Sequence, residues 1–125
     1  MNRPIPTLVH GILDVAGALM LLALPRLLNF GPNTTTYLTV VAIAVAVVTM
    51  LTRWEVSIAK VLPTKAHLTI DLVTGLLTAL SPFLFLRDAG ETGTIFLVAF
   101  GIFEIGAALL TKTVSPVEGS STRIA

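Results

Sequence analysis

The sequence predicts an all-α fold, an integral membrane four-helix bundle made of two parallel-repeat transmembrane hairpins. Three observations support this prediction. Hydrophobic residues make up 54% of the chain and charged residues only 12%, whereas an ordinary soluble domain has about 25% charged residues. Four apolar stretches are long enough to cross a bilayer, which takes about 20 residues in a helix. Histidine, aspartate and proline also recur in the same order in both halves of the chain.

The four predicted spans alternate with polar connections. The spans cover residues 7–28, 35–52, 66–86 and 94–111. The segment FGPNTTTY separates the first two spans and LRDAGETG separates the last two, and both segments carry Gly, Asn, Asp or Pro in turn-forming combinations. We therefore expect two helical hairpins with tight loops.

The connection between the two hairpins is longer and mixed in composition. In RWEVSIAKVLPTKA, residues 53–66, the apolar residues Trp54, Ile58, Val61 and Leu62 recur at helical spacing among charged residues. This pattern is typical of an amphipathic helix that lies in the membrane interface. We expect a short helix of that kind here.

Shifting the sequence by 57 residues aligns its two halves. The aligned pairs are His10 with His67, Asp14 with Asp71, and Pro25 with Pro82. Because the shift contains two spans, both halves enter the membrane in the same direction, and a pseudo-two-fold axis along the membrane normal should relate them. We predict one transmembrane domain over residues 1–113, with repeats at about 7–53 and 66–112, and a mobile polar tail over residues 114–125.

Basic residues are concentrated on the side of the two termini. That side carries Arg3, Arg53, Lys60, Lys65, Lys112 and Arg123, whereas the side of the hairpin loops carries Arg26 and Arg87. Cytoplasmic loops of membrane proteins are enriched in lysine and arginine. The distribution therefore predicts that both termini are cytoplasmic.

The segment GLLTALSPFLF, residues 75–85, resembles the signature of the SPW repeat family of small bacterial membrane proteins. Ser81 and Pro82 match the Ser-Pro-Trp motif, Phe83 stands in place of the tryptophan, and the first repeat keeps only Pro25 of the motif. The resemblance implies two transmembrane helices per repeat and a location in the bacterial inner (plasma) membrane. It implies an architecture rather than an activity, and therefore no catalytic residues.

Two histidines and three carboxylates lie inside the predicted spans: His10, Asp14, His67, Asp71 and Glu104. Burying such a group in a bilayer costs about 2.5 to 3.5 kcal/mol on insertion scales, so it usually faces the bundle interior and has a partner. The two His-x-x-x-Asp pairs each occupy one helix face, and Glu104 is expected at a similar depth. We expect all five to converge in one buried polar cluster, with the two aspartates within about 10 Å of each other.

Proline in the last turns of the first and third spans should kink or end those helices. Pro82 removes one backbone hydrogen bond, which leaves a carbonyl oxygen without its usual partner. Neighbouring hydroxyl groups often satisfy such a carbonyl in a membrane helix. We expect the Ser81 hydroxyl to do so in its own helix.

Three interpretations of the polar cluster follow. In the first, the chain is an SPW-like membrane protein with a structural or interaction role, and the histidines and aspartates tie its halves together. In the second, it is a small proton- or cation-linked transporter. In the third, it is a metal-dependent membrane enzyme, because imidazole and carboxylate ligands suit zinc, iron or manganese. The spacing differs from the Glu-x-x-His of di-iron bundles, and no catalytic motif favours an enzyme.

Composition narrows the partners and cofactors. The net charge of +1 gives no sign of a nucleic-acid partner, and the absence of cysteine excludes disulfides and thiolate metal sites. The sequence identifies no cofactor. The expected partners are the lipid bilayer and other membrane proteins or a second copy of the chain, because Ala42 and Ala46 place two small residues one turn apart on the second span.

Overall fold

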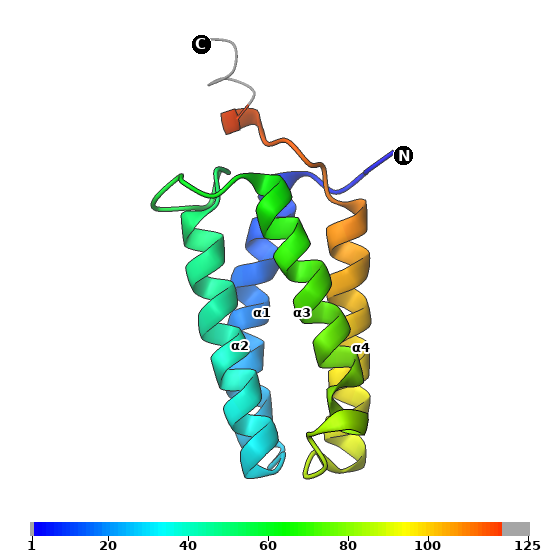
Figure 1. The fold of residues 1–125 in the computed structure, drawn as a ribbon. Coiled ribbons are helices and arrows are strands. Elements are labelled where there is room, and N and C mark those ends of the chain that lie inside the picture. Colours follow the sequence, from blue (N-terminus) through cyan, green and yellow to red (C-terminus); the bar gives the residue numbers. More distant parts are fainter. Residues whose placement is uncertain (1, 119–125) are drawn as a thin grey trace.

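Four long helices form the bundle in the computed structural model, which describes residues 2–118 (Figure 1). The helices are α1 (Thr7–Leu27), α2 (Pro32–Leu51), α3 (Thr64–Leu84) and α4 (Gly90–Leu110). Each is long and apolar enough to cross a membrane. The predicted all-helical membrane fold is therefore confirmed, and each span lies within a few residues of its expected position.

The two helices that follow the hairpin loops, α2 and α4, begin earlier than predicted. We expected a turn through Pro32 and Asn33, but Pro32 is the first residue of α2. Proline suits this position because its ring already has a helical φ angle and its missing N–H would have no partner there. The Asp88 carboxylate then accepts hydrogen bonds from the free N–H groups of Asn33, at 2.6 Å, and Thr34, at 3.2 Å. A cap from the other hairpin thus extends α2 into the predicted turn.

The helices pack as two hairpins, α1 with α2 and α3 with α4. The helices α3 and α4 approach each other closely at two glycines. A Cβ atom on Gly101 would lie 2.5 Å from the backbone nitrogen of Ala79, and one on Gly75 would lie 2.9 Å from the Gly101 carbonyl oxygen. Any larger side chain at Gly101 would therefore force the two helices apart.

The interior has an apolar half and a polar half. The apolar core lies toward the hairpin loops and consists of Leu21, Phe30, Leu38, Val41, Ala42, Leu86, Ala89, Leu97 and Phe100. Toward the end that carries both termini, the buried residues include two histidines, an aspartate and several threonines. The division places the candidate site about two helical turns inside that end of the bundle.

Two short backbone bridges close the end that carries the termini. Ile5, before α1, pairs with Thr111, after α4, and Leu62, before α3, pairs with Thr52, after α2. Each bridge joins the segment before the first helix of one hairpin to the residue after the second helix of the other hairpin. The arrangement brings Thr111 next to the start of α1 and Thr52 next to the start of α3.

The connection between the hairpins is not the amphipathic helix that we predicted. Residues 53–63 form an irregular loop, and Trp54 is fully buried instead of lying in the membrane interface. The loop can approach α1 because Gly11 has no side chain: a Cβ atom there would lie 2.6 Å from Val56 Cγ2. The loop also satisfies its own backbone, since Lys60 Nζ donates to the Trp54 carbonyl oxygen at 2.7 Å. Inward burial of Trp54 outweighs the helical periodicity.

The proline expectation is confirmed for the second hairpin. The Ser81 hydroxyl donates to the Thr78 carbonyl oxygen at 2.7 Å, and Thr78 is the residue whose carbonyl Pro82 leaves without its helical N–H. In the first hairpin, Pro25 frees the carbonyl of Leu21, whereas Arg26 donates from Nη1 to the neighbouring Leu22 carbonyl oxygen at 2.7 Å. Both helices end within a few residues of the proline.

The first residues of the predicted tail are in contact with the bundle. Ser115 is buried and its hydroxyl donates to the Arg53 carbonyl oxygen. Its backbone N–H donates to Glu118 Oε1 at 3.0 Å, and Glu118 Oε2 accepts from the backbone N–H of Thr64 at 3.2 Å. The remainder of the predicted tail, residues 119–125, lies outside the described residues.

Candidate metal centre

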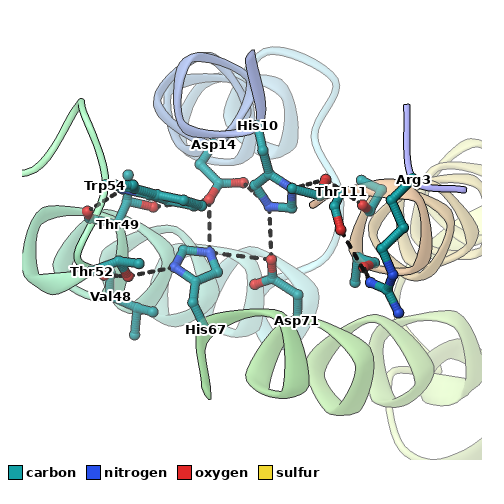
Figure 2. A network of polar contacts seen from close by, with 12 residues as sticks. Arg3, His10, Asp14, Val48, Thr49, Thr52, Trp54, His67, Asp71 and Thr111 are labelled. Atoms are coloured by element: carbon teal, nitrogen blue, oxygen red, sulfur yellow. Dashed lines mark hydrogen bonds and ion pairs between the residues drawn. The ribbon is translucent and has the colours of Figure 1, made fainter. Parts of the chain in front are cut away.

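Two histidines and two aspartates from α1 and α3 meet in the polar half of the bundle (Figure 2). His10 Nε2 lies 2.9 Å from Asp71 Oδ2, and His67 Nε2 lies 2.9 Å from Asp14 Oδ2. The distances within each helix are 3.4 Å for His10 to Asp14 and 3.2 Å for His67 to Asp71. Each imidazole therefore contacts both carboxylates, and its shorter contact is to the opposite helix.

Helical spacing explains how each pair reaches the centre. Residues four apart lie on one helix face, so His10 and Asp14 project together from α1, and His67 and Asp71 from α3. One nitrogen or oxygen from each of these four residues lies within 4.8 Å of the others. The expected proximity of Asp14 and Asp71 is confirmed.

Two threonines set the orientation of the imidazole rings. Thr111 Oγ1 lies 2.7 Å from His10 Nδ1, and Thr52 Oγ1 lies 2.7 Å from His67 Nδ1. Each hydroxyl also donates its proton to the carbonyl oxygen four residues earlier in its helix, at 2.6 Å. A hydroxyl has one proton to donate, so it must accept from the histidine. Both histidines therefore carry a proton on Nδ1 and turn Nε2 toward the centre.

The inward nitrogens differ in how they meet the carboxylates. His10 Nε2 has hydrogen-bond geometry to Asp71 Oδ2. His67 Nε2 lies at an equal distance from Asp14, yet its approach direction is not that of a hydrogen bond, and it has no hydrogen-bond partner among the described residues. Because Nδ1 already holds a proton, each Nε2 either carries a second proton or directs its lone pair at a cation.

Trp54 covers the centre from the connecting loop. Its ring centroid lies 4.3 Å from that of His67 and 5.4 Å from that of His10. The indole N–H donates to the Thr49 carbonyl oxygen at 3.0 Å, and the Thr49 hydroxyl donates to Asp14 Oδ2, also at 3.0 Å. The fully buried indole excludes water from this side and holds the four side chains in a low-dielectric environment.

Glu104, on α4, lies beside the four residues. It is 8% exposed, and its Oε2 has no hydrogen-bond partner among the described residues. A cavity of about 20 Å³ is lined by Glu104, His10, Asp14 and Asp71, which is room for about one water molecule. Glu104 therefore shares a cavity with the centre but does not belong to the set of close ligand atoms.

The centre is asymmetric, because the residue of α2 that is equivalent to Glu104 of α4 is not acidic. Thr52 and Thr111 make equivalent contacts to the two histidines, and the residues seven positions before them are Val45 and Glu104. Both Val45 and Glu104 line the small cavity. The third carboxyl group is thus supplied by α4 alone, because α2 carries valine at the equivalent position.

The donor set fits a divalent transition-metal ion. Zinc forms bonds of about 2.0–2.2 Å to imidazole nitrogen and carboxylate oxygen, which places neighbouring ligand atoms about 3.3 Å apart in a tetrahedron. The four nitrogen-to-oxygen distances here range from 2.9 to 3.4 Å, with Asp14 facing His10 through Oδ1 and His67 through Oδ2, and a set of one ligand atom from each residue lies within 4.8 Å of one another. The Nδ1–H donated to a threonine is the second hydrogen bond that metal-bound histidines usually make. Two neutral histidines and two aspartates would also balance the charge of a divalent ion.

Sequence reasoning missed Thr52, Thr111 and Trp54. A usable signal existed, because the segments IPTLVHGILD, residues 5–14, and LPTKAHLTID, residues 62–71, share a proline and threonine before each histidine. That shared start fixes where each histidine helix begins. It does not show which threonine at the end of another helix would face the imidazole.

Comparisons with protein-family models, with curated proteins and with solved structures found no match for this chain.

Proposed function

We propose that this integral membrane protein binds one divalent transition-metal ion through His10, Asp14, His67 and Asp71. The single observation that carries the proposal is the orientation of the imidazoles: both Nε2 atoms point at two carboxylates while both Nδ1–H groups are held by threonines. When both imidazoles are neutral, their Nε2 lone pairs and the two negative charges converge on one buried point. In a bilayer such a concentration of polar groups marks a functional site unless its charges are paired.

Glu104 supports a role in moving the ion rather than only storing it. This third carboxyl group lines the cavity that adjoins Asp14 and Asp71, and Trp54 is not among the residues that line this cavity. A carboxyl group in that position can receive the ion or a proton when the first ligands release it. The transport form of the proposal is therefore a small cation-linked transporter with Glu104 as the next polar group along the path.

The binding proposal is tested on the unaltered protein. Zinc or manganese at about 100 times the dissociation constant should stabilise the purified protein by about 2.7 kcal/mol, since a ligand of the folded state stabilises it by mass action. Thermal unfolding in detergent, with and without the chelator EDTA, measures this shift, and elemental analysis should find one ion per chain. Equal melting temperatures under both conditions would refute the proposal.

Two variants locate the binding site. Asp71→Asn should lower metal affinity by at least about tenfold, because it replaces a carboxylate ligand with an amide. Asp88→Asn is the matched control, since it makes the same chemical change in the loop between α3 and α4, at the other end of α3 from His67 and Asp71. Equal losses of affinity in both variants would place the metal elsewhere.

A structural role is the second candidate, and one observation favours it. If each Nε2 carries a proton, two imidazolium ions and two carboxylates form a neutral ring that joins α1 to α3. Breaking a buried ion pair by removing one partner costs about 3–5 kcal/mol. Under the structural role, Asp71→Asn destabilises the protein by the same amount with zinc and with EDTA. Under the metal role, the difference in stability between the wild type and Asp71→Asn is larger with zinc than with EDTA.

We further propose that the protein lies in a bacterial inner membrane with both termini cytoplasmic, and that its halves are SPW-like repeats. The excess of basic residues at the terminal end supports this orientation. The chain has no cysteine, so introduced thiols can be labelled without background. An impermeant reagent outside intact cells should label Asn33→Cys and not Ile58→Cys; the reverse pattern would invert the topology.

A further inference from the structure

A surface groove lies between α3 and α4 at the end that carries the termini. It has a volume of about 210 Å³ and is lined by Arg3, Lys65, Leu68, Thr69 and Leu109, among others. A second hollow of about 340 Å³ adjoins it, because Arg3 and Thr113 line both, and it adds Lys112. The combined groove is separate from the candidate metal centre, and none of the four metal ligands lines it.

Three basic side chains line the combined groove: Arg3 lines both hollows, Lys65 lines the first and Lys112 the second. Within residues 2–118, no carboxylate forms an ion pair with Arg3, Lys65 or Lys112. Arg3 uses Nη1 to donate to the carbonyl oxygens of Ala108 and Thr111, each at 3.1 Å, which ties it to the end of α4. A guanidinium group has five N–H donors in all, so further donors remain for an anion.

Lys65 is in an unfavourable place for a cation. It is the second residue of α3, and the first turn of a helix carries the positive end of the helix dipole. A lysine there adds like charge to that end. The Glu118 carboxylate accepts from the Thr64 N–H at 3.2 Å and offsets the dipole charge at this end, and a bound phosphate would offset the charge of the lysine.

The floor of the groove is apolar. Leu68, Leu72 and Leu109 line it next to the basic residues. Leu109 is exposed, Leu72 is half-buried, and Leu68 is buried at the base of the groove. A phosphate group at Arg3 and Lys65 would therefore continue directly into an environment that suits a hydrocarbon chain. Basic side chains next to an apolar surface are complementary to an amphiphile that has an anionic headgroup and a hydrocarbon chain.

We propose that the groove binds an anionic phospholipid of the leaflet next to the termini, with its phosphate held by Arg3, Lys65 and Lys112 and one acyl chain along Leu68, Leu72 and Leu109. The proposal is independent of metal binding. Basic side chains near a membrane surface typically contribute about 1 kcal/mol each to binding anionic lipid, which is about fivefold in affinity. The protein should therefore prefer phosphatidylglycerol to phosphatidylcholine.

Native mass spectrometry of the purified full chain, titrated separately with the two lipids, measures this preference. We expect the wild type to retain one phosphatidylglycerol more tightly than phosphatidylcholine, and Lys65→Gln and Lys112→Gln each to weaken phosphatidylglycerol binding about fivefold. Arg53→Gln is the matched control, because it removes one charge at the same end of the bundle outside the groove. Arg3 is left unchanged because it also supports α4.

Three results would overturn the proposal. Equal affinity of the wild type for both lipids would show that the headgroup is not recognised. An equal loss in Arg53→Gln and Lys65→Gln would reduce the effect to general charge attraction. Competition by glycerol 3-phosphate at the same concentration as the lipid would show that the acyl chain contributes nothing and that the groove binds a soluble phosphate compound.

Discussion

At the scale of single residues, the hydroxyls of Thr52 and Thr111 decide what the candidate metal centre can do. Each holds one Nδ1–H of a histidine and thereby directs the other nitrogen inward. Replacing either threonine with valine keeps the shape of the side chain but removes the acceptor. A buried donor left without a partner costs about 1–3 kcal/mol, and the loss of such an outer contact typically lowers metal affinity about 10- to 100-fold.

We therefore expect Thr111→Val to weaken zinc binding by at least about tenfold and to change the proton position on His10. Nitrogen-15 NMR distinguishes a ring protonated at Nδ1 from one protonated at Nε2. A purely steric effect of the substitution would not change the position of the proton. The control is Thr69→Val, whose hydroxyl only donates to the Lys65 carbonyl oxygen of its own helix. If Thr111→Val binds zinc as tightly as Thr69→Val, the threonine does not orient the ligand.

At the scale of elements, the second hairpin depends on the close approach of α3 and α4 at Gly101. Gly101→Ala places a methyl group 2.5 Å from two backbone atoms of α3, the nitrogen of Ala79 and the carbonyl oxygen of Gly75. Backbone atoms cannot move aside without shifting the helix, so we expect a destabilisation of about 1–3 kcal/mol. Thermal unfolding in detergent, followed by circular dichroism, measures it.

Gly106 provides the matched control on the same helix. A Cβ atom at Gly106 meets nothing within 4 Å, so Gly106→Ala should be neutral or stabilise α4 by up to about 1 kcal/mol through the better helix propensity of alanine. A Gly101→Ala variant as stable as Gly106→Ala would contradict the tight packing of α3 on α4.

At the scale of the whole molecule, Asp88 joins the loop of the second hairpin to the first hairpin. Its carboxylate accepts from the backbone of Asn33 and from the Thr34 hydroxyl, the latter at 2.7 Å, and its own carbonyl oxygen accepts from the Gly31 N–H at 3.1 Å. Burial acts to raise the pKa of Asp88, but the hydrogen bonds from Thr34 and Asn33 outweigh it and hold the pKa below its usual value of 3.8. The capping interaction stabilises the ionised form.

This lowered pKa sets the pH dependence of the contact between the hairpin loops. Its stabilisation is fully present above the usual pKa and is lost as the pH falls through the lower pKa of the folded state. Asp88→Ala should cost about 1 kcal/mol at pH 7, and its difference from the wild type should shrink as the pH falls below about 4. Unfolding of both proteins across pH tests this, with Glu91→Gln as a control. A difference that is constant with pH would exclude the ionised cap.

The sequence by itself determined the four spans, the two hairpins and five candidate site residues, of which the structure brings His10, Asp14, His67 and Asp71 into direct contact. These follow from local properties. Mean hydropathy and span length identify a membrane helix without reference to the rest of the chain, and the spacing of four residues puts His10 with Asp14, and His67 with Asp71, on one helix face. The cost of an isolated charge in a bilayer then requires the two pairs to find each other.

Only the tertiary structure decided which atoms face the centre and what covers it. The contact between His10 and Thr111 joins residues 101 positions apart, and the cap from Asp88 to Thr34 joins residues 54 apart. No local periodicity encodes such contacts, because they depend on how the hairpins dock. Trp54 shows the limit of prediction from local sequence, because its segment has the spacing of an interfacial helix. Gly11 lets the loop fold inward instead. Burial of the indole against the two imidazoles then outweighs the local pattern.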